Sequence, residues 1–203
     1  MVQGHLNNGV NFIEFQLFLG GNIMKKVYVL LAEGFEVLEA IAPIDVMRRA
    51  RIKVVTLSLN KTLEVNSAQN VMVKADDMLG SYKDGDGIFL PGGYSGYENL
   101  FKSDEAMELT KYYLDNGKMV AAICGAPSSL GRRRMIDGRN ITLHFSTHEL
   151  VKDFCNIIDE PIVKDKNLIT ASGSGYSQEL GFAILEYLAP ETIEKVKIGM
   201  TIK

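Results

Sequence analysis

Only two cysteines, Cys124 and Cys155, occur in the 203 residues of the chain. Small secreted folds that depend on disulfides usually carry more cysteines, in even-numbered frameworks. The low count therefore argues against a disulfide-rich scaffold and indicates a cytoplasmic protein with free thiols. A disulfide between the two cysteines stays open as the less favoured alternative.

Two further absences narrow the class of protein. No apolar stretch approaches the roughly 20 residues that a membrane-spanning helix requires, so we expect no membrane partner. The chain also lacks an excess of positive charge, because its formal net charge is -3 and its dense basic run, GRRRMIDGR at 131–139, is short. Nucleic-acid-binding proteins carry clustered positive charge, and we therefore expect no nucleic-acid partner.

The remaining composition, 46% hydrophobic and 23% charged, is that of an ordinary globular protein, and the length suits one domain, which we place at residues 24–203. Residues 1–23 contain no Lys or Arg, and polar residues interrupt their apolar ones, so they do not match a secretory signal. Two glycine codons (GGNGGN) shortly before Met24 can act as a ribosome-binding site. We therefore expect Met24 to be the true start and residues 1–23 to be a non-native or flexible leader.

Short apolar segments rich in β-formers alternate along the chain with segments of helical periodicity. We predict strands at 26–32, 53–59, 85–93 (ending in a Pro-Gly-Gly loop), 118–124 and 141–144, hairpins at 63–75 and 161–172, and helices at 37–50, 103–116, 127–134, 147–154 and 176–189. Ser103 and Thr147 are the expected N-caps of their helices, and Asn116-Gly117 is the expected stop of the helix at 103–116. This alternation predicts a mainly parallel sheet with helices on both faces. Pro43 should kink or split its helix, and the most apolar strand, 118–124, should be central.

Cys124 lies where a predicted strand meets a predicted helix, in VAAICGAPSSL at 120–130. Ligands of open α/β sheets bind at the carboxyl ends of strands, and Pro127 suits the first turn of a helix. Strand, sharp turn and helix indicate a nucleophile elbow, although its usual G-x-nucleophile-x-G pattern is absent. A helix N-terminus lowers the pKa of a cysteine and favours the nucleophilic thiolate. The alternative is a buried cysteine that acts as a small hydrophobic residue.

Backbone amides near Cys124 can complete an anion site. The amide of Gly125 follows the cysteine directly, and Gly92 and Gly93 end a neighbouring predicted strand. Glycines let the backbone approach a ligand closely, so these amides can bind an oxyanion. An ordinary loop at 91–93 is the alternative.

Two side chains are candidates for proton transfer. Glu36 and Glu39 share one face of the helix that follows the first strand, and the apolar neighbours of Glu39 indicate that it points inward. Of the three histidines, His144 ends a predicted strand and is the candidate base, whereas His148 lies in a helix predicted to be exposed. The alternatives are a solvated first turn for the acids and surface imidazoles for the histidines.

Taken together, these segments resemble the ThiJ/PfpI superfamily, and most of all its branch that contains the Parkinson-disease protein (DJ-one). The resemblance extends from Met24 to about Ala189 through VLLAEGFEVLEAIAPIDVMRRARIKV, FLPGG, AAICGAP, ITLH and ITASGSGYSQELGFAILEYL. It implies a flavodoxin-like α/β fold, a three-layer sandwich with a small β-hairpin, and a homodimer.

The resemblance also implies roles for individual residues. Cys124 corresponds to the reactive, easily oxidised elbow cysteine, and Glu39 to a protonated glutamate that donates a hydrogen bond to its sulfur. Gly93 and Gly125 correspond to the oxyanion-binding amides, and His144 to the nearby histidine of this branch. No cofactor and no metal is implied.

The implied function is a glutathione-independent glyoxalase or deglycase, with a small aldehyde such as methylglyoxal or a glycated adduct as substrate. A non-enzymatic oxidation sensor or redox-regulated chaperone is the first alternative, because it requires the same activated thiol. A cysteine protease or amidase is the second and ranks last, because Gly125 stands where the protease-like branch has histidine. The loop SGSG at 172–175 also lacks the arginine that often precedes it in the family.

Overall fold

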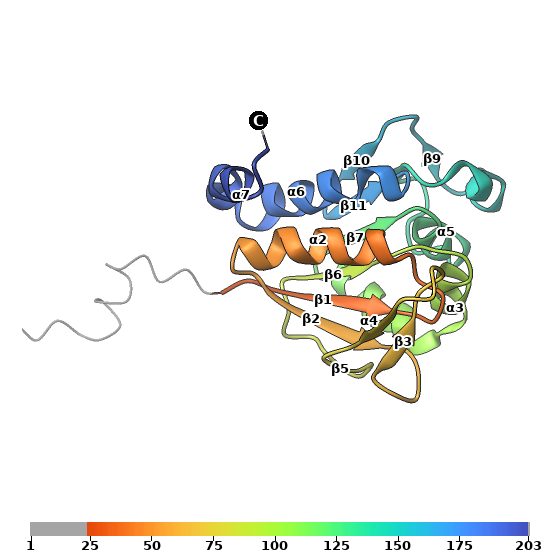
Figure 1. The fold of residues 1–203 in the computed structure, drawn as a ribbon. Coiled ribbons are helices and arrows are strands. Elements are labelled where there is room, and N and C mark those ends of the chain that lie inside the picture. Colours follow the sequence, from red (N-terminus) through yellow and green to blue (C-terminus); the bar gives the residue numbers. More distant parts are fainter. Residues whose placement is uncertain (1–23, 203) are drawn as a thin grey trace, which may run out of the picture.

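The structure, a computed structural model, describes residues 24–202, so the predicted leader lies outside the described residues. A seven-stranded sheet forms its centre (Figure 1). Across the sheet the order is β10 (Ile162–Asp165), β11 (Leu168–Ala171), β7 (Met119–Ile123), β6 (Gly87–Leu90), β1 (Lys26–Leu31), β2 (Lys53–Ser58) and β5 (Asp77–Met78). All neighbours in this sheet are parallel except β10, which runs antiparallel to β11.

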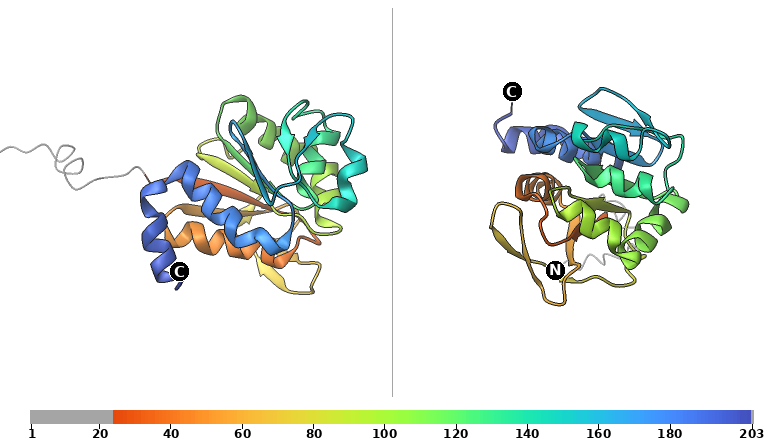
Figure 2. Two further views of the ribbon diagram at one scale, coloured as in Figure 1. Left: turned by 90° about the horizontal axis from the view of Figure 1, so that it is seen from above. Right: turned by 90° about the vertical axis from the view of Figure 1, so that its right-hand side faces the viewer.

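Helices cover both faces of the sheet (Figures 1 and 2). One face carries α2 (Val37–Arg49), α6 (Ser177–Leu188) and α7 (Ile193–Gly199), and the other carries α3 (Gly96–Lys102), α4 (Asp104–Asp115) and α5 (Ala126–Arg132). The predicted α/β sandwich with a mainly parallel sheet is therefore confirmed.

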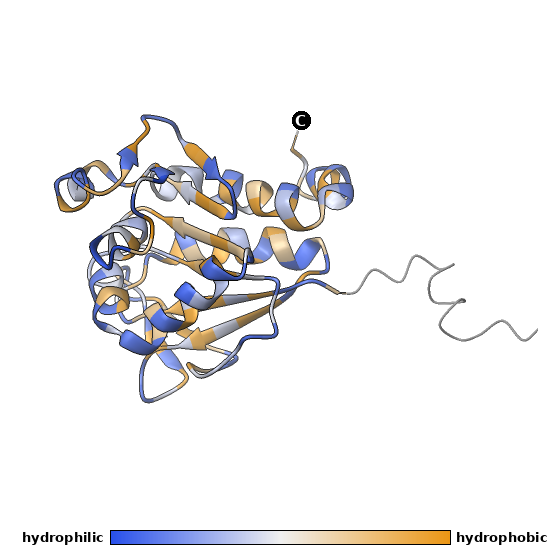
Figure 3. Ribbon diagram, turned by 180° about the vertical axis from the view of Figure 1, so that it is seen from behind, coloured by the Kyte–Doolittle hydropathy of each residue, from blue (hydrophilic) through white to orange (hydrophobic). Residues whose placement is uncertain are grey.

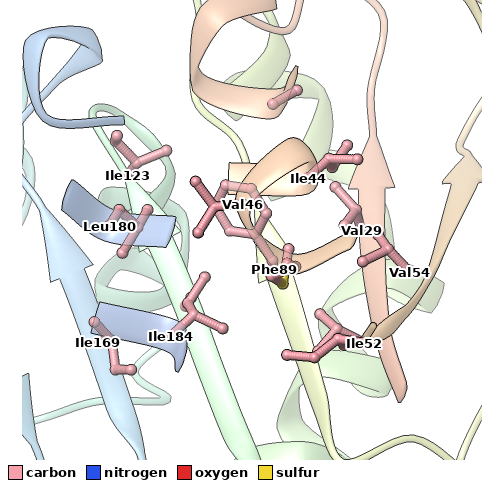
Figure 4. Packing of buried hydrophobic residues seen from close by; sticks show 14 of the residues in the cluster. Val29, Ile44, Val46, Ile52, Val54, Phe89, Ile123, Ile169, Leu180 and Ile184 are labelled. Atoms are coloured by element: carbon pink, nitrogen blue, oxygen red, sulfur yellow. The ribbon is translucent and has the colours of Figure 1, made fainter. Parts of the chain in front are cut away.

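The hydrophobic core has two layers, one on each face of the sheet, because side chains alternate between the two faces along β1. Val27 and Val29 point to the α2–α6 side, whereas Tyr28 and Leu30 point to the α3–α5 side, because successive side chains of a strand face opposite ways. Figure 4 shows the first of these layers, where Val46 and Leu180 bring α2 and α6 together over the sheet. In Figure 3 the apolar colour accordingly concentrates on the strands and on the inner faces of the helices.

Several local predictions are confirmed. The hairpins are present, as β3 (Glu64–Asn66) with β4 (Met72–Lys74) and as β10 with β11. Ser103 caps α4 by accepting a hydrogen bond from the N–H of Ala106 at 3.2 Å, and the helix stops at Asn116. The short elements β5, α3 and α7 were not foreseen, because segments of two to seven residues carry little periodicity.

Other predictions are wrong. Of the two outcomes expected at Pro43, a kink or a split, the split is wrong, since α2 runs unbroken from Val37 to Arg49. The predicted strand 141–144 is reduced to β8 (Asn140–Ile141), which pairs with β9 (Asn156–Ile157) in a separate small sheet, and the N–H of Thr142 turns to the side chain of Thr170 instead. The expectation for the strand at 118–124, by contrast, is confirmed, because β7 lies inside the sheet between β11 and β6 and is buried throughout.

The predicted helix 147–154, capped by Thr147, is also wrong. The segment forms a 3-10 helix, η1 (Phe145–Leu150), and His144 is its N-cap. The Thr147 hydroxyl donates back to the His144 carbonyl at 2.8 Å, which ties the segment into a tight turn. Within residues 24–202, no helix is long and apolar enough to cross a membrane.

Candidate active site

Cys124 lies between β7 and α5 in a backbone conformation that is uncommon for a residue with a side chain. Its φ is 61°, in the left-handed region. Two neighbours hold this conformation: the N–H of Cys124 donates to the carbonyl of Ala171 at 2.9 Å, and its carbonyl accepts from the N–H of His144 at 3.0 Å. Strained positions of this kind concentrate at functional sites, and the turn has the strand-to-helix geometry of a nucleophile elbow.

Glu39 projects from the first turn of α2 into the protein and is only 1% exposed. Its carboxylate accepts a hydrogen bond from the N–H of Gly92 at 3.0 Å and another from the Cys124 thiol. Glu36 has a different role, because it is the N-cap of α2 and accepts from the N–H of Glu39 at 2.6 Å. The two acids, which sequence pattern alone placed on one face, therefore divide into a buried partner of the thiol and a helix cap.

The glycines after β6 allow this close packing. A Cβ on Gly92 would lie 2.7 Å from a carboxylate oxygen of Glu39 and 2.8 Å from the Cβ of Cys124. Gly93 has a φ of 98°, and a Cβ there would collide with the backbone of Glu36. A side chain at either position would push the three segments of the site apart.

The pKa values of Glu39 and Cys124 are coupled. Burial raises the pKa of Glu39 to about 7, assisted by the charge of Glu36, while hydrogen bonds from Cys124 and from the N–H of Gly92 oppose the rise. Burial also raises the pKa of the Cys124 thiol to about 12, and the charge of Glu39 adds to this. Hydrogen bonds from the amides of Gly93 and Gly125 act in the opposite direction.

The expectation of a lowered pKa for Cys124 is therefore wrong. Burial and the adjacent carboxylate outweigh the amides at the start of α5, a helix of only seven residues. The expectation of a raised pKa for Glu39 is confirmed in direction. The two groups titrate as a coupled pair, because the charge of ionised Glu39 adds to the rise in the pKa of Cys124 and protonation of Glu39 removes that contribution.

His144 reaches Cys124 through its backbone, whereas its ring has other partners. Nδ1 lies 2.8 Å from the hydroxyl of Ser146, and the ring stacks on Phe145 with centroids 4.3 Å apart. Among the described residues no hydrogen bond joins this ring to Cys124 or Glu39. The structure therefore places His144 beside the thiol without making it an immediate base.

A pocket of about 400 Å³ opens on the His144 side of the site, within the size range of small-molecule sites. It is lined among others by His144, Phe145, His148, Ile158, Ser172 and Tyr176. His148 is a wall residue whose Nε2 lies 3.2 Å from the carbonyl of Leu143.

Sequence reasoning missed Tyr97, although it follows the Pro-Gly-Gly loop closely. Its ring covers Gly125, because a Cβ added there would collide with the ring. Its carbonyl accepts from the Ser129 hydroxyl at 2.7 Å, which fastens α3 to α5. An aromatic residue near a predicted oxyanion loop was the available signal.

The second cysteine takes no part in this site. Cys155 is buried, and its thiol points to the carbonyl of Ile136 at 3.6 Å. Cys124 is partly exposed, and both thiols are free, as the low cysteine count predicted. Within residues 24–202, no group of three or more His, Cys, Asp and Glu side chains is arranged to hold a metal ion.

A mainly parallel α/β sandwich with an elbow cysteine against a buried glutamate defines a class of cysteine-centred α/β proteins. The sequence model of the DJ-1/PfpI family matches residues 25–187, and the chain belongs to this family. Protein dj-1beta of Drosophila melanogaster is 34% identical over 182 residues, covering 88% of this chain and 97% of that protein. The crystal structure of Drosophila DJ-1beta superposes with a TM-score of 0.86 at 32% identity, covering 89% of this chain and all of that one.

Two other relatives bear on function. The Parkinson disease protein 7 homolog of Danio rerio is 33% identical over 185 residues, covering 88% of this chain and 98% of that protein. The putative cysteine protease YraA of Bacillus subtilis is 30% identical over 151 residues, covering 72% of this chain and 88% of that protein.

Proposed function

We propose that this protein is a stress-protective, cofactor-independent glyoxalase or deglycase that converts methylglyoxal-type aldehydes and their adducts into 2-hydroxy acids. The observation that supports it most is the contact between the Cys124 thiol and the Glu39 carboxylate, next to the amides of Gly93 and Gly125. A nucleophile, a proton acceptor with a pKa of about 7 and two anion-binding N–H groups are the parts that such a reaction requires.

The reaction begins when Cys124 passes its proton to Glu39 and the sulfur attacks the aldehyde carbon. A C–S bond forms, and the π electrons of the carbonyl move to its oxygen. The amides of Gly93 and Gly125 hold the resulting oxyanion until it takes up a proton. Transfer to Glu39 removes the charge repulsion that the thiolate would otherwise meet.

The hemithioacetal then rearranges without an external oxidant. The hydrogen of the former aldehyde carbon leaves as a proton, and the neighbouring ketone carbon gains one, so one carbon is oxidised to a thioester while the other is reduced to an alcohol. Glu39 is the nearest group that can carry these protons, and His144 is the second candidate. Water cleaves the thioester, which releases lactate from methylglyoxal or glycolate from glyoxal and restores the thiol.

Lactate formation from methylglyoxal tests this function directly. We expect turnover by the wild type and a loss of about a hundredfold or more in Cys124→Ser, because the nucleophile is gone. Cys155→Ser is the matched control and should retain the wild-type rate, since that thiol is buried away from the site. A wild type that forms no lactate above background contradicts the proposal.

An oxidation sensor or redox-regulated chaperone is the second candidate, favoured by the partial exposure of Cys124. Its oxidation to sulfinate would place new oxygens among the amides of Gly93 and Gly125 and the side chain of Glu39. Intact-protein mass spectrometry after dilute peroxide distinguishes the two functions. Selective sulfinate on Cys124 together with no lactate formation favours the sensor.

A cysteine protease or amidase is the third candidate, and one relative carries that name. Gly125 directly follows the cysteine, and the ring of His144 is engaged with Ser146 and Phe145. A casein-cleavage assay that showed Cys124-dependent proteolysis would raise this candidate above the other two.

The protein is further proposed to act as a cytoplasmic homodimer. Exposed apolar side chains on α2, Leu38 and Ile41, lie near those of the β3–β4 hairpin, Val71 and Met72, since the Gln69 side chain links the hairpin to the N-terminus of α2. Such a patch suits burial against a second copy. Light scattering coupled to size-exclusion chromatography should give twice the monomer mass.

A further inference from the structure

Two pairs of aromatic rings flank the turn that carries Cys124. On one side, the rings of Tyr94 and Tyr97 lie with centroids 6.2 Å apart and planes inclined by 58°. On the other, the rings of His144 and Phe145 are 4.3 Å apart and inclined by 34°. The separation of Tyr94 and Tyr97 falls in the range of interacting aromatic pairs, and the rings of His144 and Phe145 lie closer still.

The tyrosine pair lies next to the backbone amides of Gly93 and Gly125, the proposed oxyanion-binding groups. Tyr94 directly follows Gly93, whose N–H faces the sulfur, and Tyr97 covers Gly125, which provides the second N–H. Tyr94 is nevertheless 80% exposed, so its ring is available to a ligand of Cys124.

The second pair is linked to the backbone of Cys124. The N–H of His144 donates to the carbonyl of Cys124, and Phe145, at 76% exposed, is stacked on the His144 ring. The same two residues line the pocket of about 400 Å³, which Ile158 and Tyr176 complete with further apolar surface.

We infer that these ring pairs form a specificity subsite, and that the preferred substrates are 2-oxoaldehydes with an aryl group next to the carbonyl. The inference rests on the proposed function, which fixes the reacting carbonyl at the Cys124 sulfur. The group attached to that carbonyl then has to pass one of the two ring pairs. Exposed aromatic faces stabilise a planar unsaturated group by stacking, whereas a methyl group gains little from them.

Competition between phenylglyoxal and methylglyoxal tests the subsite through turnover. We expect a higher kcat/KM for phenylglyoxal, which yields mandelate, than for methylglyoxal. Tyr94→Ala and Phe145→Ala should each lower the ratio of the two kcat/KM values by about threefold to tenfold. Tyr187→Ala is the control, because this tyrosine of α6 is exposed but lies far from the site. Its hydroxyl contacts the carbonyl of Gly117, which precedes β7, whereas Cys124 follows the other end of that strand. A ratio that stays unchanged in both subsite variants contradicts the subsite.

Alkylation of Cys124 tests the same subsite without turnover. The sulfur displaces iodide from N-phenyl-iodoacetamide or from iodoacetamide, so that a C–S bond replaces the C–I bond, and mass spectrometry follows the rate. After normalisation to free N-acetylcysteine, we expect the phenyl reagent to be favoured in the wild type and in Tyr187→Ala, and less favoured in Tyr94→Ala and Phe145→Ala. Equal preference in all four proteins overturns the subsite.

Together, the turnover and alkylation experiments distinguish failure of the subsite from failure of the proposed enzymatic function. Aryl preference in alkylation without lactate or mandelate formation supports the subsite and contradicts the proposed enzymatic function. Turnover of both aldehydes without aryl preference in either experiment supports the function and contradicts the subsite.

Discussion

The thiol of Cys124 donates a hydrogen bond to the carboxylate of Glu39, which projects from the first turn of α2 and meets the cysteine at the carboxyl end of the sheet. Glu39 is buried and Cys124 is partly exposed. The charge of Glu39 raises the pKa of Cys124, whereas the hydrogen bond from Cys124 lowers the pKa of Glu39. The reactivity of Cys124 and the pH dependence of stability therefore depend on which of the two groups holds a proton.

Replacing the carboxylate by an amide should make the thiol more acidic. In Glu39→Gln the negative charge that raises the pKa of Cys124 is absent, while the amides of Gly93 and Gly125 remain. We expect the pKa of the thiol to fall from its raised value, as measured by the pH dependence of iodoacetamide alkylation. Glu39→Asp keeps the charge but shortens the side chain and should disturb the contact. A thiol pKa that is the same in all three proteins contradicts the role of Glu39.

The same carboxyl group should make stability depend on pH. Its pKa is raised from 4.5 to about 7 on folding, so the native state binds this proton more tightly than the unfolded state does. The resulting stabilisation is complete below about pH 4.5 and is lost as pH rises through 7, by about 3 kcal/mol at most.

Urea denaturation of wild type and Glu39→Gln at several pH values measures this contribution. The free energy of unfolding of the variant should gain on that of the wild type between pH 5 and pH 8, a window set by the shift of Glu39. A difference between the two proteins that is flat over that window is inconsistent with a buried carboxyl of raised pKa.

Gly93 should tolerate no side chain. Gly93→Ala combines a left-handed φ with a collision against the backbone of Glu36, and we expect a destabilisation of about 3 kcal/mol or more, together with loss of Cys124 reactivity. Gly117→Ala is the matched control, because Gly117 has a φ of 66° with nothing near its Cβ position. It should lose only about 1 kcal/mol in thermal or urea unfolding. Equal losses of stability in the two variants would contradict the predicted collision at Gly93.

The two cysteines should differ in accessibility. Cys124 is partly exposed and Cys155 buried, so a thiol reagent should label Cys124 in the folded protein and both residues only after denaturation. Peptide mapping by mass spectrometry reads this out. Labelling of Cys155 at a similar rate in the native protein contradicts the burial seen here.

Much of the fold followed from local patterns. Apolar runs and helical periodicity predicted β1, β2, β7, α4 and α6, and Ser103 marked the beginning of α4, because these signals depend on neighbours within a few residues. The region around His144 was misjudged for the opposite reason. Its backbone is held by Cys124, and the N–H of Thr142 by Thr170, so contacts from elsewhere in the fold overrule the local strand and helix preferences.

Local sequence pattern was sufficient to place Cys124 after a buried strand at the start of a helix, and to turn Glu39 inward on an amphipathic turn. Both conclusions need only the periodicity of side chains along a strand or a helix. The proton distribution between Glu39 and Cys124, and the aromatic rings near the thiol, became evident from the folded arrangement alone. Those properties depend on burial and on charges brought together from four separate segments of the chain, and no local pattern records such distances.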